Sequence, residues 1–178
     1  ERIARDAGIK TPVQIIVHTL AEVNDHLSRG QYFFTDIYAQ GIELYRMPGK
    51  KLRAPTPLDA TQALAAAQQH YDIWMPSAQQ FLVNYEFNRD KGWNNLAVFA
   101  LHQAAERAYA AYLLLHTNYR PHTHNIEFLR SQCERLESTL IPLWPRHYQR
   151  DRRKFQLLKR AYIEARYSPH FKITKDEL

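Results

Sequence analysis

Three polar side chains interrupt the otherwise apolar segment between residues 96 and 115: Gln103, Glu106 and Arg107. On a helix these positions are three and four residues apart, so their side chains emerge together on one face. An amide, a carboxylate and a guanidinium are costly inside an apolar helix unless other groups pair with them or they face a cleft. This segment is therefore the first candidate for a binding site.

A second set of polar side chains lies on the last helical pattern of the chain. Arg160 and Tyr167 are seven residues apart, so both lie on one face of that helix. Tyr162 and Arg166 are four apart and share a face in the same way. An arginine here suits either a nucleotide phosphate or the Glu106 carboxylate, because its planar fork bonds both. Two interpretations therefore stay open: a phosphate site, or an ion pair in the interior or at a dimer interface.

Histidine and cysteine give weaker signals. His122 and His124 are separated by one residue without a third ligand nearby, which is a weak pattern for a metal site. We expect His124 to cap or anchor the helix that follows it. Cys133 has no neighbour in sequence that would activate its thiol, and we interpret it as a buried packing residue. Neither a metal nor another cofactor is expected.

Composition limits the class of protein. The 178 residues are long enough for one well-buried core, and the hydrophobic content of 45% is ordinary for a globular domain. Only five glycines are present, and strong helix formers dominate after residue 57, so the fold is expected to be mainly α. No apolar run approaches the roughly 18 to 20 residues that span a bilayer. A single cysteine favours a reducing compartment, and we expect a cytoplasmic protein without membrane contact.

The formal net charge is +6, and much of the excess lies between residues 146 and 160. Basic residues alternating with aromatic ones can follow a phosphate backbone and stack on bases. A solvated loop and helix start is the alternative that we favour, because charge alone is a weak signal. The basic residues of this stretch are Arg146, Arg150, Arg152, Arg153, Lys154, Lys159 and Arg160.

The elements that carry these residues follow from periodicity. Residues 13–18 and 41–45 read as strands flanking a helix over 20–40, a fragment that must pack on a larger sheet or on the helical part. A linker rich in proline and positive charge follows at 47–57. Four helical patterns come next, so we predict an up-and-down bundle of four or five helices. They cover residues 58–89, 93–116, 124–140 and 152–167.

Three details of these elements are also predicted. Pro76 is expected to kink the first helix of the bundle. Asn94 and Asn95 are available to cap the second helix. Thr174 and Glu177 have the spacing of a capping box, which opens a helix.

Three sequence blocks in this order resemble the HEPN domain, across residues 58–178. They are Leu101–Arg107, Asn118–His124, and Leu157–Tyr167 followed by Phe171–Thr174. The segment ahead of them is similar to the tail of the minimal nucleotidyltransferase domain that precedes HEPN in fused bacterial or archaeal proteins. The resemblance implies a nucleotidyltransferase remnant at 1–46, a linker at 47–57 and a HEPN bundle at 58–178.

Two activities of such proteins depend on motifs that can be recognised in a sequence. The transferase type uses a Gly-Ser pair and an Asp-x-Asp pair to hold a metal, and neither occurs in this sequence. HEPN ribonucleases carry an arginine and a histidine with four to six residues between them. The nearest approach that we found is Arg166 to His170, with Pro169 expected to end the helix between them.

The resemblance implies a polar cleft between the second and fourth helices of the bundle. We therefore predict a homodimeric module that binds a nucleotide or RNA and serves a nucleotidyltransferase domain on the same polypeptide. One alternative is a metal-independent endoribonuclease of toxin type using Arg166 and His170, and another is a purely structural dimerisation domain. The predicted ligand-binding residues are Gln103, Glu106, Arg107, His124, Arg160, Tyr162, Arg166 and Tyr167.

Overall fold

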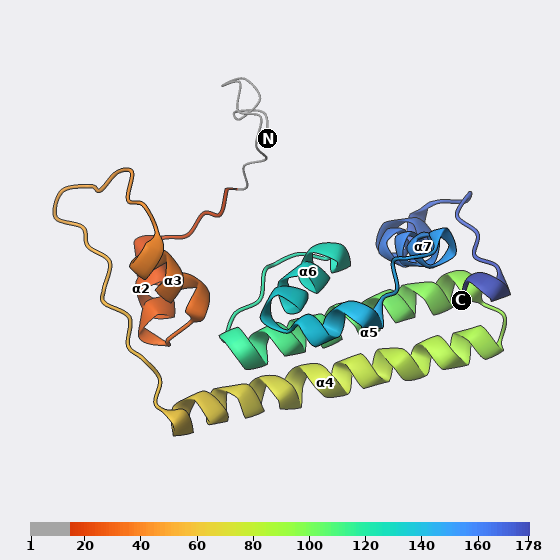
Figure 1. Ribbon diagram of the computed structural model, residues 1–178, viewed down its shortest axis with the longest axis horizontal. Helices are drawn as coiled ribbons and strands as arrows, with labels where there is room; N and C mark the ends of the chain where they lie inside the picture. The colour runs from red at the N-terminus through yellow and green to blue at the C-terminus, as the bar shows by residue number, and fades with distance from the viewer. Residues whose placement is uncertain (1–14) are drawn as a thin grey trace, which may run out of the picture. The chain divides into compact units, whose positions relative to one another are not determined.

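The computed structural model describes residues 15–178, and the chain divides between Pro57 and Leu58 into two compact units (Figure 1). Each unit is described by itself. Within the described residues all regular secondary structure is helical, so the predicted mainly α fold is confirmed. No helix of residues 15–178 combines the length and the apolar character needed to cross a bilayer.

The first unit contains two short helices, α2 (Leu20–Ser28) and α3 (Tyr32–Gln40). A capping box opens α2, in which Thr19 and Glu22 bond each other's backbone N–H groups. Gly30 separates the helices with a φ of 62°, a conformation that glycine adopts without strain. Leu27 and Phe34 are buried between the two helices and form the small core of this unit.

The predicted strand-helix-strand fragment is wrong. The expected helix over 20–40 is two helices, and residues 41–45 are irregular. Ile42 and Leu44 are 87% and 92% exposed, and no strand of the described residues lies beside them. An isolated strand leaves its backbone groups unpaired, so alternating apolar residues without a partner do not form one. Of the strand expected at 13–18, residues 13 and 14 lie outside the described range and residues 15–18 are irregular.

The second unit is built around α5 (Asn94–Thr117). The long helix α4 (Ala60–Asp90) covers one side of α5, and α6 (Ile126–Leu136) and α7 (Gln149–Tyr167) cover the other side (Figure 1). Two 3-10 helices complete the unit, η1 (Ser138–Leu143) and η2 (Lys175–Glu177). The central position of α5 explains why it carries most of the buried residues, whereas Ala78 alone is buried on α4.

The helix ends correct one prediction, the capping of α5, and support another, the capping box at Thr174. Pro76 lies within α4, which continues through it. Asn94 and Asn95 do not cap α5; their side-chain amides donate to the carbonyls of Ile173 and Phe171, each at 2.8 Å. They thereby fasten the C-terminal segment to α5. The capping box formed by Thr174 and Glu177 is present, and it opens η2.

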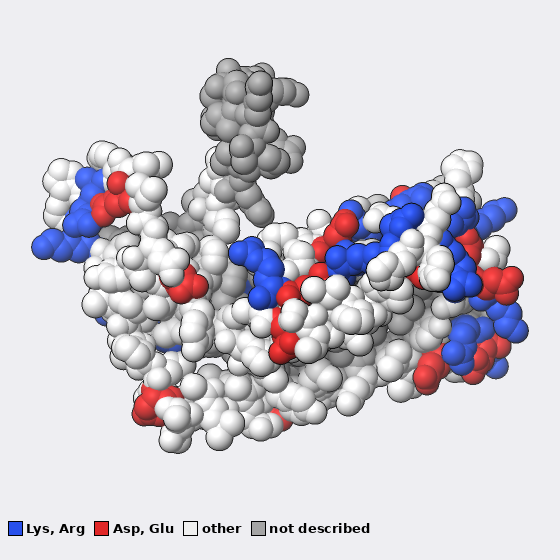
Figure 2. Space-filling model, in the orientation of Figure 1, with Lys and Arg blue, Asp and Glu red and all other residues white. Residues whose placement is uncertain are grey.

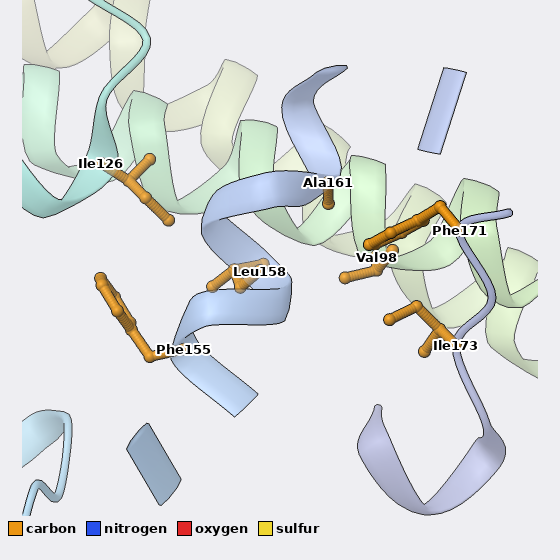
Figure 3. Close-up of a cluster of buried hydrophobic side chains, with 7 residues drawn as sticks. All are labelled: Val98, Ile126, Phe155, Leu158, Ala161, Phe171 and Ile173. Atoms are coloured by element: carbon orange, nitrogen blue, oxygen red, sulfur yellow. The ribbon is translucent and has the colours of Figure 1, made fainter. Parts of the chain in front are cut away.

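The main core of this unit joins α5, α6 and α7 with the C-terminal segment (Figure 3). Its buried members are Val98, Ile126, Phe155, Leu158, Ala161, Phe171 and Ile173. A second cluster contains Leu113, Leu129 and Cys133. Cys133 is fully buried as predicted, and burial raises the pKa of its thiol to about 12, so it is an inert packing residue.

The α6 helix allows a matched test of this core. Leu129 is fully buried and Leu136 is 49% exposed on the same helix. We expect Leu129→Ala to lower the free energy of unfolding by about 2–5 kcal/mol, because it removes core contacts and leaves a cavity. Leu136→Ala should cost less than about 1 kcal/mol. Urea titration followed by tryptophan fluorescence measures both, since every tryptophan lies in this unit; equal losses would contradict the described packing.

Candidate functional site

Glu106 is the centre of the polar cluster on α5. Its carboxylate is only 4% exposed and accepts hydrogen bonds from the Nδ1 of His124 at 3.0 and 3.1 Å. The side-chain amide of Gln103, one turn earlier, donates to the same carboxylate at 3.3 Å. Because an ionised carboxylate only accepts, Nδ1 of His124 carries a proton. The histidine ring is 57% exposed, so the buried Glu106 orients a ring that faces solvent.

Tyr162 on α7 continues this cluster. The His124 ring stacks on it at 4.3 Å between centroids, with an interplanar angle of 17°. The guanidinium carbon of Arg166 lies 4.5 Å from the centre of the same tyrosine ring, and its Nε donates to the Tyr162 carbonyl at 2.7 Å. Arg166 also lies 5.0 Å from the ring of Phe99 and 4.9 Å from that of Tyr167. An exposed cation is thus held on the same tyrosine ring that His124 stacks on.

His102 completes the cluster, and sequence reasoning missed it. It is fully buried, stacks on Tyr162 at 5.3 Å, and neither ring nitrogen has a hydrogen-bond partner among the described residues. Burial, aided by the charges of His124 and Arg166, lowers its pKa from 6.5 to about 4. The sequence feature that could have identified it is its spacing, since His102 lies four residues before Glu106 and therefore on the same helix face.

Arg107 lies outside this cluster and faces α4. Its guanidinium lies 5.0 Å from the ring of Trp74 and 5.9 Å from that of Phe81, both on α4. One residue along a helix turns the side chain by about 100°, so Glu106 faces His124 whereas Arg107 faces α4. The structure therefore brings together Gln103, Glu106, His124, Tyr162 and Arg166, with Tyr167 joined through Arg166.

Arg160 lies at the edge of this group. Its guanidinium forms an ion pair with Glu164 one turn along α7, at 2.6 Å. An open pocket beside the cluster is lined in part by Arg160, His124 and Tyr162. The other lining residues are Asn125, Lys159, Ile163 and Glu164.

The basic stretch predicted between residues 146 and 160 is interlaced with carboxylates (Figure 2). Lys159 pairs with Glu127 at 2.5 Å, and this contact lowers the pKa of the Glu127 carboxyl. Arg153 pairs with Glu177 at 2.9 Å. Arg146 with Glu134 and Arg150 with Asp151 form further pairs. Most of the positive charge in this stretch is therefore partly balanced within the protein.

The pair Arg166 and His170 is not assembled in the structure. Arg166 turns back onto Tyr162, while α7 ends at Tyr167 and the exposed His170 follows in a turn. Arg120 and His124 have the same separation in sequence and were overlooked. Both of these lie on the loop after α5, close to Glu106.

The sequence profile of the HEPN domain matches residues 71–178, which include most of α4 and all of α5, α6 and α7. The chain belongs to the HEPN domain family. No curated protein matches the chain closely enough to provide a named relative. Gln103, Glu106, His124, Tyr162 and Arg166 all lie inside the part of the chain that matches the HEPN domain, and none of them belongs to the first unit.

The neutral state of His102 predicts a pH dependence of stability. The unfolded histidine takes up a proton near pH 6.5, whereas the folded one does so only near pH 4. Stability is therefore complete above this window and is lost as the pH falls through it, by about 3 kcal/mol in total. We expect His102→Leu to flatten the dependence of the unfolding free energy between pH 7 and 4.

His122→Leu is the matched control, because His122 is exposed on the loop before α6. It should retain the wild-type dependence on pH. Parallel curves for wild type and His102→Leu in urea titrations at several pH values would show that His102 is not buried as a neutral ring.

Proposed function

We propose that this HEPN domain is a dimerising module that binds a nucleotide or RNA through the face formed by His124, Tyr162 and Arg166. The observation that carries the proposal is the Glu106–His124 pair stacked on Tyr162 beside Arg166. A buried carboxylate holds an exposed imidazole, and an aromatic ring holds an exposed guanidinium next to it. A rigid arrangement of this kind suits an anionic ligand that also has a planar group.

Each part of such a ligand has a counterpart on this face. No ion pair of residues 15–178 includes Arg166, so its guanidinium is available for a phosphate oxygen. Tyr167 is exposed next to it and suits stacking on a base. The pocket beside His124 gives room for the remainder of the ligand.

Two protein partners belong to the proposal. A second copy of the HEPN domain would cover apolar side chains that α4 exposes along one face: Leu64, Tyr71 and Leu82. A nucleotidyltransferase domain of the same polypeptide would cover the exposed apolar residues of the first unit, Ile42 and Leu44. Neighbouring exposed apolar side chains favour a protein contact over a fully solvated surface.

Arg166→Gln tests the nucleotide site. We expect the dissociation constant for ATP, or for a short single-stranded RNA, to rise more than tenfold, because a phosphate loses its charged partner. Calorimetry at fixed salt measures the change. Arg135→Gln removes the same charge from an exposed position of α6 and should change the affinity less than twofold. Equal affinities for wild type and Arg166→Gln would refute the site.

RNA cleavage is a second candidate, and one observation favours it. His124 and Arg166 contact the same Tyr162 ring, and Glu106 orients the His124 ring as a carboxylate orients a general base. His124 would then move a proton, and Arg166 would stabilise charge on the phosphate. Such a reaction needs a ribose 2′-hydroxyl as the nucleophile.

An end-labelled RNA incubated with the purified protein tests this candidate. We expect His124→Ala to lower the cleavage rate at least a hundredfold, as removal of a general acid–base group does. His170→Ala should cleave like wild type. Unchanged cleavage by His124→Ala, or none by the wild type, would exclude this candidate and leave the binding proposal intact.

A further inference from the structure

A second group of cations lies on the other side of α5, between that helix and α4. The guanidinium carbons of Arg107 and Arg120 lie 5.0 and 4.7 Å from the centre of the same ring, that of Trp74. Trp74 comes from α4, Arg107 from α5 and Arg120 from the loop after α5. Three segments of the HEPN domain therefore place two positive charges around one indole.

These two arginines are not neutralised by a direct partner. No ion pair of residues 15–178 includes either of them, whereas Arg153 and Arg160 each pair with a glutamate. The Nε of Arg107 is buried and has no hydrogen-bond acceptor in the described part of the chain. A buried guanidinium donor without an acceptor is costly, and an anionic oxygen would satisfy it.

The local charge is also unbalanced. Burial lowers the pKa of Arg120, and the like charge of Arg107 acts in the same direction. The carboxylate of Glu106 opposes this shift, but its hydrogen bonds go to His124 and Gln103. One engaged carboxylate near two arginines leaves a net positive charge. An anion bound between them would remove their mutual repulsion.

The loop that carries Arg120 is fixed at both ends. The Oδ1 of Asn118, which ends α5 in a left-handed conformation with φ 50°, lies 2.8 Å from the Nε2 of His70 on α4. The hydroxyl of Thr117 donates to the Tyr119 carbonyl at 2.9 Å. At the other end, His124 is bound to Glu106. Arg120 is thus held in position before any ligand arrives, which lowers the entropic cost of binding.

We propose that Arg107, Arg120 and Trp74 form a second anion site, which takes a phosphate group. Two planar guanidinium forks match the oxygens of a phosphate, and a diphosphate offers enough oxygens for both. The site is spatially distinct from the nucleotide face, because Trp74 lies on α4 and Tyr162 on α7, on opposite sides of α5. It can therefore exist whether or not Arg166 binds a nucleotide.

Titration with inorganic pyrophosphate, followed by calorimetry at fixed salt, tests the site. We expect Arg120→Gln and Arg107→Gln each to weaken binding at least tenfold. Arg135→Gln should bind within twofold of wild type. Circular dichroism checks the fold of each variant. If Arg107→Gln does not fold, Arg120→Gln decides the result, since Arg120 lies on a loop.

Tryptophan fluorescence locates the bound anion. Because both guanidinium groups lie against Trp74, binding between them should change its emission. Trp74→Phe should lose most of this response. Trp93 and Trp144 remain in that variant as internal controls.

Three results would overturn the proposal. The first is no binding of pyrophosphate by the wild type at millimolar concentration, and the second is wild-type affinity in Arg120→Gln. The third is an equal loss in Arg120→Gln and Arg135→Gln, which would indicate attraction by overall charge. Parallel titrations with ADP and AMP identify the source of the phosphate: tighter binding of ADP than pyrophosphate, still dependent on Arg120, indicates a nucleotide. Equal affinities indicate recognition of the diphosphate alone.

Discussion

The buried carboxylate of Glu106 constrains the rest of the HEPN domain. A carboxylate in the middle of the central helix requires donors, and the loop after α5 provides one through His124. Fixing His124 fixes that loop, which positions Arg120 on the α4 side. The His124 ring also stacks on Tyr162, so the same contact sets the relation between the loop and α7. The buried Glu106 carboxylate therefore links the packing on both faces of α5.

The central position of α5 gives neighbouring residues different roles. Glu106 points toward α7 and His124, while Arg107 points toward α4 and Trp74. If α5 were covered on one side only, either Glu106 or Arg107 would face solvent. Here both sides are covered, so adjacent polar residues lead to two separate sites. Their proximity in sequence suggested a single cleft, and the helical rotation between them explains the difference.

Local patterns predicted the helices of the bundle, the burial of Cys133 and the capping box at Thr174, because each depends on residues close in sequence. The errors involve distant partners. Residues 41–45 alternate like a strand but have no strand beside them, and Asn94 bonds the carbonyl of Ile173 rather than its own helix. The grouping of Glu106, His124 and Tyr162 followed from resemblance to the family, whereas the full burial of His102 and the contact of Arg120 with Trp74 depend on three-dimensional packing.

The arginines available to a ligand lie outside the stretch in which the sequence concentrates positive charge. Basic residues over 146–160 are largely paired with carboxylates, which partly balance their charge. Arg107, Arg120 and Arg166 are held instead by aromatic rings. A ring attracts a guanidinium through its face without neutralising it, so the N–H groups at the edge still lack anionic partners. Arginines on aromatic supports are therefore better candidates for anion recognition than a longer run of paired cations.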